Sequence, residues 1–256
     1  MGTIEYVDLE VARAARGVRL VVASVLPSPW SEAAKGVLRL ARVPVLAVRY
    51  RSGDAETAAW MGASNVPVVR YDDELPRTGW AEITQLAARL APDRGIVPSD
   101  DAARVRAFGL LHEIAGEDGL GWNARAWMIH AGLESGGARG FPLPVARYLS
   151  SRYALTSDAA TRAPRRVRAV LSLLDAELAR ARAAGHAWLL GDAPSALDVY
   201  AATSLTPLVL RDDAECPAMV PSLRGAFASL RDALGDAVSP ALVAHRERVI
   251  ERPITL

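Results

Sequence analysis

The sequence predicts an α/β domain followed by an all-helical domain. Short apolar runs alternate with helical patterns over the first ninety residues, whereas helices and connections alone follow. The segment 92–98, with two prolines and a glycine, marks a linker between the two parts. We therefore expect an N-terminal domain over 17–91, an all-α domain over 100–240 and a C-terminal tail over 241–256.

The α/β domain follows from its periodicity. The run VRLVVASV at 18–25 is compact and β-branched, which is typical of a buried strand. Pro29 suits the first turn of the next helix, because its missing N–H costs nothing there. The elements expected after the first strand are a helix over 29–42, a strand over 44–50, a hairpin over 66–75 with Asp72 and Asp73 at its turn, and a helix over 81–91.

The second half reads as helices throughout. Ser195 and Asp198 have the spacing of a capping box at the start of a nearly all-apolar helix, which is a structural role. Three glycines interrupt an otherwise helical pattern in the segment 112–127. The helices expected here cover 101–117, 163–185, 195–210 and 222–235.

Composition excludes several classes of function. The 256 residues are 51% hydrophobic and 23% charged with a net charge of +1, so no strong field attracts nucleic acid or a membrane surface. No apolar stretch approaches the ~20 residues that span a bilayer, and the N-terminus lacks the apolar core of a signal peptide. Cys216 is the only cysteine, which excludes an internal disulfide and favours a reduced, cytoplasmic setting. The four histidines are scattered, so we expect no metal.

Two short motifs carry candidate chemistry. Ser28 and Ser31 flank a Pro-Trp pair between the first strand and its helix. Pro67 stands between two valines at the entrance of a strand, where it removes a ladder donor. Either the Val66–Pro67 bond is cis or this is an edge strand. A cis bond would expose the backbone of Val66 to a peptide-like ligand.

Together, SPWSEAAKGVL, NVPVV and WLLGDAPSALDVYAA resemble the glutathione transferase superfamily over about residues 17–240. The resemblance implies a thioredoxin-like α/β domain plus an all-α domain, a homodimer, and glutathione as co-substrate. It further implies that the glutathione thiolate attacks a small apolar electrophile. Ser28 falls where the family keeps the residue that contacts the sulfur. The alternative is that its hydroxyl only caps the helix.

The resemblance also assigns the other site residues. The usual Glu-Ser or Gln-Ser pair that holds the glutamyl end is replaced here by Gly79 and Trp80. Trp80 either anchors the core or fills that subsite. Residues expected to bind glutathione are Asn65, Val66, Pro67, Arg77, Thr78, Gly79 and Trp80. Those expected to line the electrophile pocket are Ser31, His112, Glu113 and Trp122, with Glu117 and Arg125 as further candidates.

Two other functions remain open. Because the Glu-Ser or Gln-Ser pair is missing, the chain could have lost its chemistry and act as a binding or interaction module. A thiol-disulfide or dehydroascorbate-type reductase would need a cysteine at position 28. This chain has Ser28 there, and Cys216 lies far along the helical domain.

Overall fold

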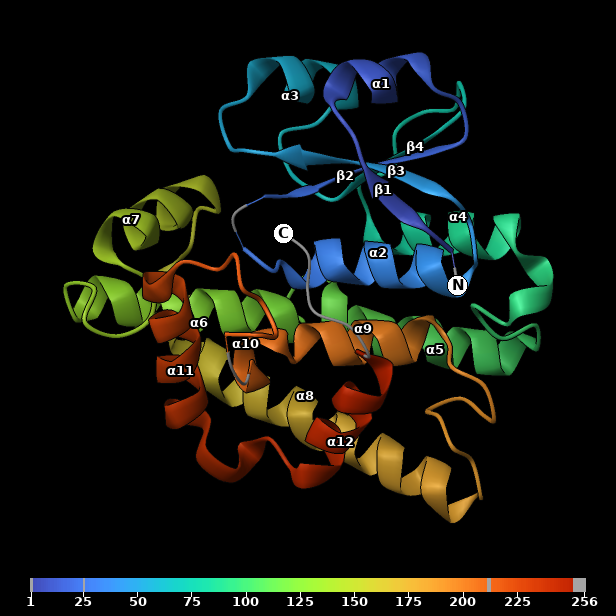
Figure 1. Cartoon of the computed structure of the whole chain (residues 1–256). Helices are drawn as coiled ribbons and strands as arrows, with labels where there is room; N and C mark the ends of the chain where they lie inside the picture. The colour runs from blue at the N-terminus through green and yellow to red at the C-terminus, as the bar shows by residue number, and fades with distance from the viewer. Residues whose placement is uncertain (1, 25, 211–212, 251–256) are drawn as a thin grey trace.

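The structure, a computed structural model, describes residues 2–24, 26–210 and 213–250. A small sheet with helices on both faces sits on a layer of helices (Figure 1). The α/β part contains β1 (Ile4–Tyr6), α1 (Leu9–Ala14), β2 (Val18–Ala23), α2 (Pro29–Leu40), β3 (Val45–Tyr50), α3 (Ala55–Met61), β4 (Val68–Tyr71) and α4 (Trp80–Leu90). After a short 3₁₀ turn, Pro92–Arg94, come α5 (Asp101–Ala115), α6 (Leu120–Glu134), α7 (Leu143–Arg152), α8 (Ser157–Ala183), α9 (Ala196–Ser204), α10 (Thr206–Val209), α11 (Pro221–Leu234) and α12 (Pro240–Val249).

The sheet has the strand order β1-β3-β2-β4. β2 runs parallel to β3, with Ala23 opposite Tyr50. β4 runs antiparallel to β2, with Val21 opposite Val68. The carboxyl ends of β2 and β3 therefore meet the amino end of β4 at one edge of the sheet. That edge carries both motifs singled out in the sequence.

Helices α1 and α3 cover one face of the sheet, and α2 and α4 cover the other (Figure 1). Alternate residues of β2 face the two sides: Leu20 belongs to the large core beneath α2, and Val21 packs with Met61 of α3. Both side chains are fully buried, which explains the uninterrupted apolar run. Where α2 crosses α9, a Cβ on Gly36 would lie 2.5 Å from Cγ1 of Val199. The two domains are therefore in close contact along α2.

The predicted fold class is confirmed: a thioredoxin-like α/β domain is followed by a helical one. The predicted strands and helices of the first domain correspond to β2, α2, β3, β4 and α4. The second arm of the predicted hairpin is reduced to a single bridge between Val69 and Arg77. The predicted helix 195–210 is interrupted after Ser204, and Pro207 lies in the first turn of the short α10.

Two boundaries need correction. The sheet begins at Ile4, before the expected start at residue 17, because β1 is a three-residue edge strand too short for periodicity to reveal. The predicted tail over 241–256 contains α12, which packs against α9 and buries Leu242, His245 and Arg246. Residues 251–256 of that tail lie outside the described part. Helices α1, α3, α6 and α7 were also not predicted.

The predicted capping box is present at the start of α9. The Asp198 carboxylate is fully buried and accepts hydrogen bonds from Ser195 N (2.8 Å), Ser195 Oγ (2.8 Å) and Leu189 N (3.0 Å). It thereby ties the preceding loop to the helix that packs against α2. Because the donors are buried, none has water as a substitute acceptor.

We expect Asp198→Ala to lower the free energy of unfolding by about 3 kcal/mol or more, because three donors lose their acceptor. Ser195→Ala removes one hydrogen bond and should cost about 1 kcal/mol. Urea denaturation followed by circular dichroism measures both values. Equal losses in the two variants would contradict a carboxylate-centred cap.

Candidate functional site

Ser28 lies at the junction of β2 and α2. It is the N-cap residue of α2, its backbone carbonyl accepts from Glu32 N (2.9 Å), and the residue is 6% exposed. Its hydroxyl makes no capping hydrogen bond to the N–H groups of α2. The capping alternative for this hydroxyl is therefore not realised. The positive end of the α2 dipole lies beside an oxygen that is not used for capping.

Ser31 has a different environment. Its Oγ accepts from Ala23 N at 3.3 Å, and the residue is 1% exposed. The hydroxyl thus fastens the end of β2 to α2. Its hydroxyl is thus engaged within the fold, and the expected place of Ser31 in an electrophile pocket stays a prediction.

The Val66–Pro67 peptide bond is cis, as one of the two interpretations predicted. Within the described part of the chain, the N–H and C=O of Val66 have no backbone partner. The preceding residue is engaged from the helical domain, because Arg152 Nη2 donates to Asn65 Oδ1 (2.6 Å) and to Ser64 O (2.6 Å). Asn65 therefore holds α7 against this edge of the sheet.

The start of α4 is occupied by its own side chains. Glu82 Oε2 accepts from Thr78 N (3.2 Å) and Gly79 N (3.0 Å). The guanidinium of Arg77 pairs with Glu74, which also binds Arg89. An external carboxylate would have to compete with these internal acceptors for the same donors.

Trp80 is an anchor between the domains. Its ring lies 6.1 Å from Phe108, 6.3 Å from His112 and 6.4 Å from Tyr200, measured between centroids. Its carbonyl accepts from the hydroxyl of Tyr200 at 3.3 Å. Of the two interpretations of Trp80, these contacts favour the core anchor.

The helical domain meets the start of α2 at the break between α5 and α6. The indole Nε1 of Trp30 donates to Ala115 O at 2.8 Å. A Cβ on Gly121 would lie 3.0 Å from the Trp30 ring, so a glycine gives the ring room to approach. Trp30 of the Pro-Trp pair thus packs against the glycine-containing segment 112–127.

Arg125 of α6 stacks on two aromatic rings at this junction. Its guanidinium carbon lies 4.4 Å from the centroid of Trp30 and 4.8 Å from that of Tyr153. The rings of Trp122 and Tyr153 meet in a T-shaped arrangement at a centroid distance of 5.4 Å. We call the rings of Trp30, Trp122 and Tyr153 the aromatic cage. Each of its residues is partly exposed, and so is Arg125.

The other expected pocket residues lie elsewhere. Glu113 forms an ion pair with Arg166 of α8 (2.7 Å), which ties it to another helix. His112 is exposed beside Trp80, and Glu117 is exposed at the end of α5. Trp122 alone of the four expected pocket residues joins the aromatic cage. Trp30 and Tyr153 were missed, although the sequence marked the first by its Pro-Trp pair.

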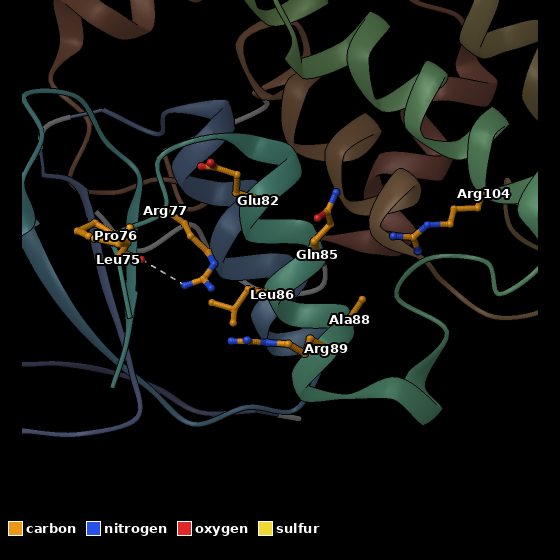
Figure 2. Close-up of a pocket in the computed structure, with 9 residues that line it drawn as sticks. All are labelled: Leu75, Pro76, Arg77, Glu82, Gln85, Leu86, Ala88, Arg89 and Arg104. Carbon is orange, nitrogen blue, oxygen red and sulfur yellow. Dashed lines mark hydrogen bonds between the residues drawn. The ribbon is translucent and has the colours of Figure 1, made fainter. Parts of the chain in front are cut away.

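A separate cavity of about 750 Å³, which none of these rings lines, lies along α4 (Figure 2). Leu75 stands at its edge and is 85% exposed. Arg104 reaches it from α5 (Figure 2). The lining residues are Leu75, Pro76, Arg77, Glu82, Gln85, Leu86, Ala88, Arg89 and Arg104.

A buried ion pair underlies the first turns of α2. Lys35 Nζ lies 2.7 Å from Glu32 Oε1, with side-chain exposures of 2% and 10%. Burial raises the pKa of Glu32, and the charge of Lys35 opposes this shift. The pair keeps a carboxylate one turn from Ser28 neutralised.

A shared metal site and a membrane-spanning helix are the two further features to consider among the described residues. Among the described residues, no three or more His, Cys, Asp or Glu side chains are placed to share a metal ion. Within the same residues, no helix has both the length and the apolarity to cross a bilayer.

Comparisons with known proteins identify the fold. No protein-family model matches the sequence, and no curated protein matches it. Solved structures match over nearly the whole chain. The β-etherase LigF of Sphingobium sp. strain SYK-6 aligns with a TM-score of 0.63 at 15% identity, covering 92% of this chain and 96% of its own. A Tau class glutathione S-transferase of mango, Mangifera indica, aligns at 0.59 and 16%, covering 93% and 90%. A glutathione S-transferase of Methylobacillus flagellatus with glutathione bound aligns at 0.55 and 14%, covering 93% and 100%.

We expect Lys35→Met to lower the free energy of unfolding by about 3–5 kcal/mol, because it leaves Glu32 buried without this partner. Removing Lys35 takes away the charge that opposes the raised pKa of Glu32, so this pKa rises further and the loss relative to the native protein grows as the pH rises above the usual value of 4.5. Chemical denaturation at pH 5 and pH 8 measures this difference. The control is the double variant Glu32→Gln/Lys35→Met, which should recover stability and lose the pH dependence. A pH-independent loss in Lys35→Met would contradict the pairing.

Proposed function

The chain has the glutathione transferase fold, and from this premise we propose that it is a glutathione transferase-like enzyme. It joins the glutathione thiolate to a small, largely apolar electrophile, and Ser28 is its catalytic residue. The observation that carries the proposal is that the hydroxyl of Ser28 makes no capping hydrogen bond to α2. This hydroxyl lies at the positive end of a twelve-residue helix.

The energetics of this arrangement are sufficient. A thiol of pKa near 8.5 needs roughly 2–3 kcal/mol of preferential thiolate stabilisation to ionise below pH 7. A hydroxyl donating to the charged sulfur contributes about 1.5–3 kcal/mol. The start of α2 adds about 0.3–1 kcal/mol, and up to ~2 when partly buried. The thiol proton leaves to solvent, and the sulfur then attacks the electrophile.

Glutathione would be held mainly by backbone groups. The N–H and C=O of Val66, which have no backbone partner among the described residues and precede the cis bond to Pro67, suit the cysteinyl portion as an added strand does. Asn65 borders this segment. At the glutamyl end, Arg77, Thr78 and Gly79 are already bonded internally, so this end would rely on the remaining first-turn N–H groups of α4.

The same internal bonds favour a second candidate function. A chain whose glutamyl subsite is filled by Glu82 could serve as a non-catalytic binding or interaction module. The two functions differ in whether the protein retains glutathione. In either case we place the protein in the reduced cytoplasm, since Cys216 is its only cysteine and is buried.

We also propose a homodimer, as the fold resemblance implies. The surface around the cavity of Figure 2 is the candidate interface, because it combines the exposed Leu75 with charged groups of both signs. An exposed leucine rimmed by charges is typical of a protein-protein contact.

The role of Ser28 is tested by ligand binding and by substitution. Isothermal titration of the protein with glutathione and with the inert S-methyl glutathione should give micromolar to low-millimolar affinity for both. Ser28→Ala should lower kcat/KM with 1-chloro-2,4-dinitrobenzene about 10- to 100-fold and move the pH-rate midpoint upward, because the thiolate loses a donor.

Ser135→Ala, which removes a hydroxyl at the end of α6, is the control and should keep the native kcat/KM and pH-rate midpoint. Unchanged turnover in Ser28→Ala would remove this residue from the mechanism. No binding of either ligand would favour the non-catalytic module.

The proposed homodimer is tested by the mass of the protein in solution. Light scattering should give a dimeric mass for the native protein and a monomeric mass for Leu75→Asp, since a buried carboxylate at the interface is costly. Val11→Asp places the same charge on an exposed valine of α1 and should remain dimeric. A monomeric native protein would contradict the proposal.

A further inference from the structure

Arg125 packs against two rings of the aromatic cage. Trp30 is positioned by its hydrogen bond to Ala115 O, and Tyr153 packs against Trp122 in a T-shaped contact. The guanidinium stacks on both rings at 4.4 and 4.8 Å. Stacking uses the faces of a guanidinium and leaves the N–H donors along its edge available.

The charge of Arg125 is not neutralised. Within the described part of the chain, no carboxylate lies within ion-pair distance of it, and it makes no hydrogen bond. Arg166, another partly buried arginine of this domain, is paired with Glu113 at 2.7 Å. Desolvation lowers the pKa of Arg125, and the charge of Arg152 lowers it further.

Arg152 adds a second positive charge with neutral partners. Its Nη2 bonds to Ser64 O and Asn65 Oδ1, which leaves its charge uncompensated by these contacts. The ring of Tyr148 lies 6.0 Å from its guanidinium. Two arginines and several aromatic rings therefore border the junction where α2 begins.

This combination selects one class of ligand. A fixed guanidinium edge matches the two oxygens of a carboxylate, and partly exposed aromatic faces match an aromatic ring. Trp30 follows Ser28 by two residues, so a ligand bound here lies beside the start of α2. We propose that Arg125 binds the carboxylate of an aromatic second substrate, an inference that rests on the function proposed above and names its substrate class.

A suitable reactive probe is 4-chloro-3-nitrobenzoate. The glutathione sulfur forms a bond to the ring carbon that carries chlorine, the carbon–chlorine bond breaks, chloride leaves, and the thiol proton goes to solvent. The electron pair of the sulfur supplies the new bond, so no oxidant or reductant is needed. The amide of the same acid is the neutral counterpart.

The binding experiment does not depend on glutathione. Calorimetry should show that the native protein binds the unreactive 3-nitrobenzoate about tenfold or more tightly than 3-nitrobenzamide. Arg125→Gln should abolish this preference, and Arg125→Lys should keep part of it because it retains the charge without the fork. The matched control is Arg168→Gln. It removes a guanidinium that stacks on Trp127, which lies on α6 as Arg125 does, and it should leave the preference intact.

The turnover experiment places the ligand at the reacting centre. The ratio of kcat/KM for 4-chloro-3-nitrobenzoate to kcat/KM for the amide should be about tenfold or more higher in the native protein than in Arg125→Gln, a comparison that cancels the different intrinsic reactivities of the two compounds. Circular dichroism melting curves of both Arg125 variants establish that they are folded. Equal binding of 3-nitrobenzoate and 3-nitrobenzamide by the native protein overturns the inference, whether or not the protein binds glutathione.

The carboxylate that Arg125 binds has two possible sources, the aromatic second substrate and glutathione itself, and the Arg125→Gln variant distinguishes them. If Arg125→Gln weakens glutathione binding and leaves benzoate binding unchanged, the arginine serves glutathione and the inference is wrong. If benzoate preference depends on Arg125 while glutathione does not bind, the carboxylate site stands and the transferase function fails. The two proposals can thus fail independently.

Discussion

The candidate site depends on the seating of the Trp30 indole at the break between α5 and α6. Its N–H satisfies the carbonyl of Ala115, the last residue of α5, which the helix itself leaves without a partner. Its ring rests against Gly121 on one side and carries Arg125 on another. Trp30 therefore orients the beginning of α2, joins the two domains and builds one wall of the aromatic cage at the same time.

The two ends of the site differ in how their polar groups are satisfied. At the start of α4, the N–H groups of Thr78 and Gly79 bond to Glu82, so this end needs no ligand to complete it. At Arg125, a partly desolvated guanidinium stacks on rings and lacks an acidic partner within the described residues. Because an uncompensated charge is costly to desolvate, an anionic ligand gains most at this second end.

Much of the fold could be predicted from the sequence because local patterns carried it. The β-branched run of β2, the spacing of Ser195 and Asp198, and the proline before β4 each have a local physical cause. The three-residue β1 could not be predicted, because it is a strand only through its pairing with β3. The site was predicted in part: Ser28 and the cis Val66–Pro67 bond lie on sheet edges that topology brings together. The partnership of Trp30, Arg125 and Tyr153 joins three helical segments far apart in sequence, and no local pattern reports such a contact.

Selectivity would then lie in the helical domain. Under the proposed function, the contacts that the α/β domain offers to glutathione would be chiefly backbone groups, at Val66 and at the start of α4, and backbone groups distinguish poorly between ligands of similar shape. Side chains of α6 and its neighbours differ in charge and ring content, and Asn65 is already engaged by Arg152 from α7. A change at position 125 would therefore alter which second substrate is accepted while leaving the edge of the sheet, and the hydroxyl of Ser28, in place.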